Sequence, residues 1–91
     1  MELQGKLIVI NDIQQITDSF QKREFVVETQ DGNYTQEILL ESHNDRVDLV
    51  ENYEIGESLK FSINLRGKRY EKIGEPTKWF NSIVCWKIER V

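Results

Sequence analysis

Basic and aromatic side chains are interleaved over a short stretch of the last third of the sequence. The basic ones are Arg66, Lys68, Arg69, Lys72 and Lys78, and the aromatic ones are Tyr70 and Trp79. Cationic groups neutralise phosphates, and aromatic rings stack on nucleobases of any identity, so this combination favours binding of single-stranded nucleic acid. The alternative is a mobile basic loop that has no partner.

Residues that could perform catalysis or bind a metal are few. The sequence has one histidine, His43, and one cysteine, Cys85, and the two lack the spacing of a metal site. It contains neither a glycine-rich phosphate loop nor a dinucleotide-binding turn. We therefore expect no enzymatic activity, no metal and no cofactor.

Charge is distributed unevenly along the chain, whose net charge is −4. Residues 24–57 hold ten acidic residues and a single basic one, Arg46, whereas residues 60–87 hold seven basic and two acidic residues. This pattern predicts a folded domain with a basic face beside an acidic face. The alternative is that the two kinds of charge mix on the surface when the chain folds.

Length and composition are those of one small domain that spans residues 1–91. Apolar residues make up 38% of the chain and charged residues 31%, as in a folded globular protein. No apolar run reaches the roughly 20 residues that span a bilayer, and the N-terminal segment lacks a signal-peptide pattern. We therefore expect no membrane partner. Because a single cysteine cannot form an internal disulfide, we also expect a cytoplasmic protein.

Strand patterns occupy most of the chain. Residues 5–13 and 23–29 are rich in β-branched and aromatic side chains, and Gly5 indicates a bend or a bulge in the first of these segments. The Asp-Gly dipeptide at residues 31–32 predicts a tight turn. This turn would join residues 23–29 to an antiparallel strand at residues 34–41.

The strand pattern breaks at residues 42–56, where apolar side chains follow helical spacing and predict one short helix within Asn44–Asn52. Apolar and polar side chains alternate again over residues 57–66, which predicts the fourth strand, and the last strand begins at residue 78. Residues 67–77 are expected to form a loop because they contain three glycine or proline residues. The alternation assigns four side chains of the fourth strand to the core: Leu59, Phe61, Ile63 and Leu65.

The predicted order is three strands, a short helix and two further strands. This order is typical of an all-β fold, the five-stranded Greek-key barrel of the OB type, with one short helix between strands 3 and 4. The alternative, an SH3-like barrel, lacks a helix at this place. In an OB fold the loop between strands 4 and 5 forms one wall of the binding cleft. We expect Lys22 and Arg23, at the start of the second strand, to line the opposite wall.

The last strand contains both tryptophans, and its alternation divides the aromatic side chains between two faces. Phe80 and Trp86 share the more apolar face, so we expect them to be buried in the barrel. Trp79 belongs to the other face, beside the basic residues, and is expected at the surface. A bulge between Asn81 and Ile83 would reverse part of this assignment.

Three segments of the chain resemble the DUF3127 family of small OB-fold proteins from bacteria and phages. They are KREFVVET at residues 22–29, NYEIGESLKFSINLRGKRY at residues 52–70 and WFNSIVCWKIE at residues 79–89. The order and spacing of the three segments extend over nearly the whole chain. The family is similar to single-stranded DNA-binding proteins, so the resemblance implies a nucleic-acid-binding OB fold.

These observations together favour sequence-tolerant binding of single-stranded DNA, and the sequence does not separate DNA from RNA as the ligand. The alternative function is a protein-interaction or assembly module on the same barrel, without nucleic acid. The small size of the domain and its strand edges also leave a homodimer or a higher oligomer open. The residues expected to bind nucleic acid are Lys22, Arg23, Arg66, Lys68, Arg69, Tyr70, Lys72, Lys78 and Trp79.

Overall fold

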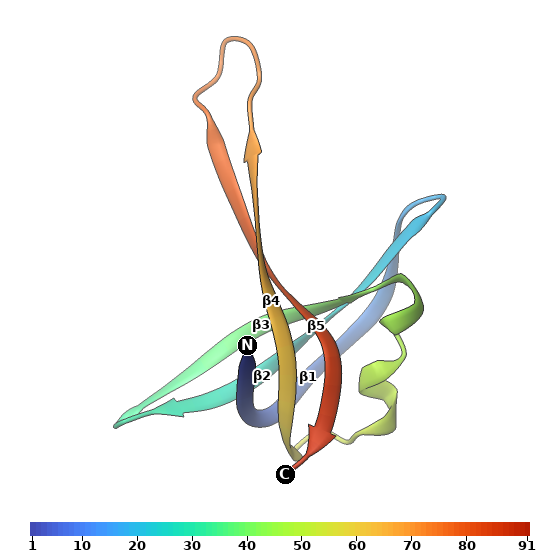
Figure 1. Cartoon of the computed structure of the whole chain (residues 1–91), viewed down its shortest axis with the longest axis vertical. Helices are drawn as coiled ribbons and strands as arrows, with labels where there is room; N and C mark the ends of the chain where they lie inside the picture. The colour runs from blue at the N-terminus through green and yellow to red at the C-terminus, as the bar shows by residue number, and fades with distance from the viewer.

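Five strands close into a barrel in the computed structural model, which describes all residues from Met1 to Val91. The barrel order is β1-β2-β3-β5-β4, and this confirms the predicted OB-type architecture (Figure 1). The elements are β1 (Glu2–Thr17), β2 (Phe20–Asp31), β3 (Tyr34–His43), η1 (Asn44–Arg46), η2 (Leu49–Asn52), β4 (Ser58–Tyr70) and β5 (Lys78–Arg90).

The first strand closes the barrel because it pairs with two neighbours in turn. Glu2 to Lys6 pair with β4, and Lys6 to Thr17 pair with β2. Gly5 lies where β1 passes from one partner to the other. A Cβ atom at this position would lie 2.5 Å from the carbonyl oxygen of Glu28, which is closer than atoms can pack. Glycine is therefore required for the close approach of β1 to β2.

The second and third strands form the predicted antiparallel hairpin. Their register runs from the pair of Lys22 and His43 to the pair of Asp31 and Tyr34. Gly32 occupies the turn with a φ of 60°, in the left-handed region that glycine adopts without strain. The Asp-Gly signal in the sequence thus marks the turn that joins the two strands.

The segment between β3 and β4 is helical, at the place that the sequence predicts. It consists of two short 3₁₀ helices, η1 and η2, rather than one continuous helix. Val50 of η2 is completely buried, so this segment covers one opening of the barrel with an apolar side chain. Gly56, with a φ of 96°, reverses the chain into β4.

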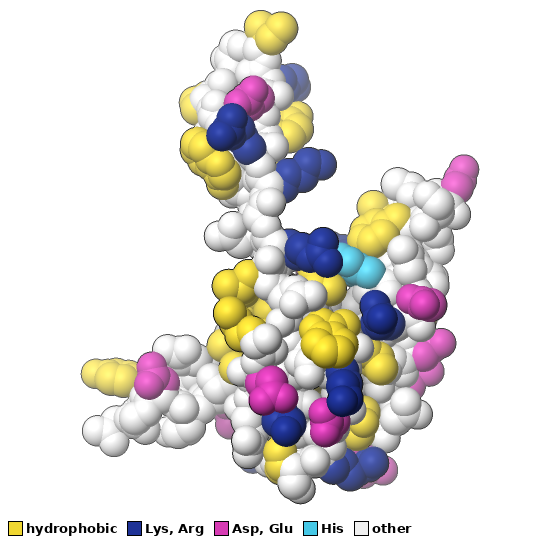
Figure 2. Space-filling view, viewed as in Figure 1, with side chains coloured by type: hydrophobic (Ala, Val, Ile, Leu, Met, Phe, Trp, Pro, Cys, Tyr) yellow, Lys and Arg dark blue, Asp and Glu magenta, His cyan; other side chains and the backbone are white.

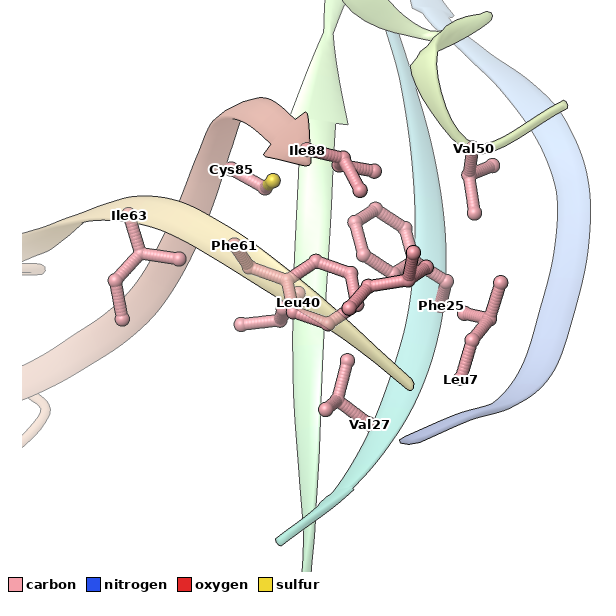
Figure 3. Packing of buried hydrophobic residues seen from close by; sticks show 10 residues of the cluster. Leu7, Phe25, Val27, Leu40, Val50, Phe61, Ile63, Cys85 and Ile88 are labelled. Carbon is pink, nitrogen blue, oxygen red and sulfur yellow. The ribbon is translucent and has the colours of Figure 1, made fainter. Parts of the chain in front are cut away.

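Ten buried side chains form the core of the barrel: Leu7, Phe25, Val27, Leu40, Val50, Leu59, Phe61, Ile63, Cys85 and Ile88 (Figure 3). The rings of Phe25 and Phe61 lie at its centre, with centroids 6.0 Å apart. Burial raises the pKa of the Cys85 thiol to about 11. Cys85 therefore remains an uncharged thiol and packs as a small apolar side chain.

The fourth strand is longer than the sequence indicated, and together with the fifth it forms a hairpin that projects far from the barrel (Figure 1). The predicted loop at residues 67–77 is wrong at its start, because β4 continues to Tyr70 and only residues 71–77 form the connection. Leu65 was expected in the core but is 63% exposed. It lies on the core side of β4, beyond the point where the barrel ends.

The expected burial of Trp86 and Phe80 is wrong: their side chains are 41% and 58% exposed. The cause for Trp86 is a bulge in the β4–β5 ladder. Ile63 pairs with Cys85 and Ser62 pairs with Lys87, so Trp86 is an extra residue without a partner. The extra residue shifts the alternation of β5, so that Cys85 enters the core and the side chains of Phe80 and Trp86 face outwards.

The core predicts a strong contrast between two phenylalanines. Phe61→Ala should lower the free energy of unfolding by about 3–5 kcal/mol, because it leaves a cavity in a small core. Phe80→Ala removes the same atoms from an exposed strand and should change that free energy by less than about 1 kcal/mol. Urea denaturation of both variants measures the difference. Equal losses would contradict the assignment of the core.

Candidate nucleic-acid interface

The projecting part of the β4–β5 hairpin has two faces, because residues paired across an antiparallel ladder lie on the same side. Arg66 pairs with Ser82, Lys68 with Phe80, and Tyr70 with Lys78. These three pairs lie on the side that continues the exterior of the barrel. We call this surface the outer hairpin face and define its functional members as Arg66, Lys68, Tyr70, Lys78 and Phe80.

Aromatic rings on the outer hairpin face are available to a ligand. Tyr70 and Phe80 contact each other edge to face, with ring centroids 6.3 Å apart and an angle of 77° between the planes. Neither ring is buried. The two rings hold each other in place while they leave surface on which a flat ligand can stack.

The opposite face of the hairpin also combines a cation with a ring. Arg69 pairs with Trp79 across the ladder, and its guanidinium lies 6.0 Å from the centre of the indole. Trp79 is 65% exposed, as predicted. Because the hairpin has only two strands and stands clear of the barrel, both faces are open to solvent.

Most positive charges of the protein are paired with carboxylates, but those of the outer hairpin face are not. Seven of the twelve Lys and Arg side chains form an ion pair within 4.0 Å. The unpaired ones are Lys6, Arg46, Arg66, Lys68 and Lys78. Figure 2 shows Lys and Arg side chains along the hairpin and down to its junction with the barrel. The outer hairpin face therefore presents positive charge that no nearby carboxylate neutralises.

Two of the predicted basic residues are partly neutralised by nearby carboxylates. Arg69 lies 3.3 Å from Glu71, and Lys72 lies 4.0 Å from Glu75. Both pairs are exposed to solvent, so each is weak and can exchange its partner for another anion.

The structure separates Lys22 from Arg23, which were expected to line the same wall. The Arg23 side chain is only 13% exposed, and its guanidinium donates to Glu51 at 2.7 Å and to the carbonyl oxygen of Asn11 at 2.9 Å. It joins η2 to β1. Lys22 points outwards and lines a hollow between β2, β3 and the base of the hairpin, beside Phe80. Lys22 therefore faces the hairpin, and Arg23 does not.

Acidic side chains gather on the outer side of the β2–β3 hairpin. Glu24 pairs with Glu41, and Glu28 pairs with Glu37, so four carboxylates lie on neighbouring positions of two strands. Like charges directly opposite one another repel, and this surface therefore repels other anions as well. The charge asymmetry of the sequence thus becomes an acidic β2–β3 surface and a basic β4–β5 hairpin.

A cavity of about 290 Å³ lies at the base of the hairpin and contains residues that the sequence analysis did not connect. It is lined by His43, Arg46, Asn64, Arg66, Val84, Cys85 and Trp86. Trp86 was missed because strict alternation assigned it to the core. Arg46 was missed because it is distant in sequence from the other basic residues. The only available signal was its position as the single cation within a long acidic stretch.

No group of three or more His, Cys, Asp or Glu side chains is placed so that it could hold a metal ion. No helix of the protein has the length and apolar character that crossing a membrane requires. His43 contacts Glu41 at 2.8 Å and the ring of Phe20, with centroids 4.9 Å apart.

The different surroundings of Lys22 and Arg23 predict different roles in stability. Arg23→Ala removes a charge-assisted hydrogen bond from a largely buried position and should lower the free energy of unfolding by about 1.5–3 kcal/mol. Lys22→Ala removes only a loose contact with Glu24 at 3.9 Å and should cost less than about 1 kcal/mol. Chemical denaturation compares the two variants. If Lys22→Ala were the more destabilising change, the structural role of Arg23 would be wrong.

The sequence matches one family model, and the fold occurs in solved structures. The sequence matches the model of the domain of unknown function DUF3127 over residues 2–89. No curated protein matches the sequence. Among solved structures, the chain is similar to the mitochondrial single-stranded DNA binding protein Rim1 from S. cerevisiae, with a TM-score of 0.71 and 13% identity. That alignment covers 100% of this chain and 92% of the other.

A second similar structure is a single-stranded DNA-binding protein of Plasmodium falciparum in complex with single-stranded DNA. Its TM-score is 0.58 at 16% identity, and the alignment covers 96% of this chain and 85% of the other. At these identities the likeness establishes the fold. Since the family model extends over nearly the entire sequence, the chain belongs to the DUF3127 family.

Proposed function

We propose that this protein binds single-stranded DNA, with little preference for sequence, along the outer hairpin face. One observation carries the proposal: three cations without a carboxylate partner, Arg66, Lys68 and Lys78, share a face with the exposed rings of Tyr70 and Phe80. Backbone phosphates and nucleobases are the two chemical groups that such a surface binds together.

The geometry of the strands suggests how a DNA strand would lie. Residues of one face recur at every second position, about 6.8 Å apart along the strand. Arg66, Lys68 and Tyr70 therefore form a row along the long axis of the hairpin, with Lys78 and Phe80 beside it. A DNA strand bound along this row would have its phosphates near the ammonium and guanidinium groups, and its bases would stack on the two aromatic rings. Stacking and charge neutralisation involve no covalent step and no cofactor, so the proposed role is binding alone.

The remaining basic and aromatic residues of the hairpin extend the proposed path. Arg69 and Trp79 occupy the opposite face, and Lys72 lies close to the tip. A DNA strand that passes around the hairpin would contact these three side chains. Lys22 would contact the same DNA strand from the barrel side, but Glu24 and Glu41 line the same hollow, so we expect a smaller contribution from it. Arg23 is left out because its guanidinium already contacts Glu51 and Asn11.

The structural neighbours support DNA as the ligand rather than RNA. Both are single-stranded DNA-binding proteins, and one is in complex with single-stranded DNA. Because both are less than 25% identical to this chain, their similarity supports the fold alone. The proposed interface rests on the residues of this chain. A parallel titration with an RNA strand decides between the two nucleic acids.

A second candidate function is association with a protein, and a separate surface favours it. Val9 pairs with Val26 across β1 and β2, and Val26 pairs with Leu39 across β2 and β3. The three side chains form an apolar row on the outer side of the barrel, and Val9 and Leu39 are exposed. Exposed apolar rows of this kind occur where proteins associate.

The proposed function predicts salt-dependent binding of fluorescein-labelled (dT)15, measured by fluorescence anisotropy. Each phosphate contact contributes about −0.7 to the slope of log affinity against log salt for single strands, so the three cations of the outer hairpin face alone contribute about −2. Lys68→Ala should weaken binding and flatten the slope by about 0.7. Lys6→Ala is the matched control, because Lys6 is also unpaired but lies beside Glu28 and Ser58, away from the hairpin.

Two results would contradict this function. If the wild-type protein does not bind (dT)15 at low salt, the association role is the better account. If Lys6→Ala and Lys68→Ala weaken binding equally, DNA is held by net charge and not by the outer hairpin face. Equal affinity for (rU)15 would extend the ligand class to RNA.

A further inference from the structure

The cavity at the base of the hairpin differs from the other hollows of the surface. It brings together two guanidinium groups, those of Arg46 and Arg66, and neither has a carboxylate within ion-pair distance. The indole of Trp86 forms part of its wall, and no Asp or Glu side chain lines it. Its volume of about 290 Å³ is close to the lower limit of small-ligand pockets, about 300 Å³. The cavity thus combines an aromatic surface with positive charge that is free to bind an anion.

The bulge in β5 is the reason that Trp86 lines this cavity. Without the extra residue, the pairing of Phe61 with Ile88 would direct residue 86 towards the core. With it, Cys85 fills the core position and the indole lies at the surface. Bulges are common next to binding sites, where they redirect one side chain. Val84 and Cys85, both buried, also line the cavity.

The cavity is continuous with the outer hairpin face because Arg66 belongs to both. On the other side, Arg46 comes from η1, in the segment that joins β3 to β4. Figure 2 shows the single histidine, His43, beside Lys and Arg side chains at this junction. A DNA strand that follows the hairpin towards the barrel would therefore reach the cavity next.

We infer that the cavity is a nucleotide subsite, which takes one base against the Trp86 indole and the adjoining phosphate between Arg46 and Arg66. Asn64 offers both a donor and an acceptor to the edge of that base. This inference rests on the proposed function, and it specifies where one nucleotide of the DNA strand would be held. One nucleotide anchors the strand at the barrel, and the following nucleotides extend along the hairpin.

The test uses fluorescein-labelled (dT)15 and two variants outside the outer hairpin face. Trp86→Ala should weaken binding by roughly 5- to 150-fold, the range for the loss of one stacked base. Arg46→Ala should weaken binding and flatten the salt slope by about 0.7, the value of one phosphate contact. The controls are Tyr34→Ala, at the tip of the β2–β3 hairpin, and Lys6→Ala. If Trp86→Ala and Arg46→Ala bind (dT)15 as tightly as their respective controls do, the subsite is wrong.

The outcomes separate this inference from the proposed function. If Lys68→Ala weakens binding while Arg46→Ala and Trp86→Ala do not, the hairpin binds DNA and the subsite is wrong. If the wild-type protein does not bind at low salt, both are wrong.

A second measurement applies if Trp86→Ala does not fold. Trp86→Phe keeps an aromatic ring in the cavity and should retain most of the affinity. In the wild-type complex, a strand that contains 5-iododeoxyuridine should form a photo-crosslink with Trp86. Crosslinks confined to residues 68–80, with none at Trp86, would overturn the subsite.

Discussion

The ladder between β4 and β5 contains one more residue on the β5 side than on the β4 side. That residue is Trp86. On one side of it the pair of Phe61 and Ile88 packs in the core, and on the other side the pair of Ile63 and Cys85 does the same. The ladder is therefore apolar towards the core on both sides of the bulge. The shifted alternation continues along the hairpin, so that Lys68 and Phe80 share the outer face. Core packing and surface chemistry thus depend on the same irregularity.

Electrostatics give the two long hairpins opposite properties. The β2–β3 hairpin presents carboxylates at neighbouring positions, including Glu24 and Glu41, whereas the β4–β5 hairpin presents cations without partners. The net charge is negative, so a polyanion is repelled at long range, and only the local charge of the hairpin can attract it. At physiological ionic strength the Debye length is about 8 Å, which makes the nearby charges decisive. A small acidic protein can therefore offer a basic binding surface.

Sequence patterns predicted the barrel because its determinants are local. The Asp-Gly turn after Thr29 and the alternation through Phe61 are each visible within a few residues. The positions of Trp86 and Arg46 depend on contacts between distant segments. A single extra residue reverses the face of Trp86, and Arg46 meets residues of β4 and β5 at the cavity only in the folded chain. Arg23 shows the opposite problem, since a cation that appears free in the sequence is bound to Glu51 in the fold.

The proposed function requires that single-stranded DNA lies on the outer hairpin face. The most direct measurement is a ¹H–¹⁵N correlation NMR titration of the wild-type protein with unlabelled (dT)15 at low salt. We expect the largest chemical-shift changes in residues 66–70 and 78–82, on the two strands of the hairpin. Changes confined to β1, β2 and β3, near Val26 and Leu39, or the absence of any change at saturating DNA, would contradict it.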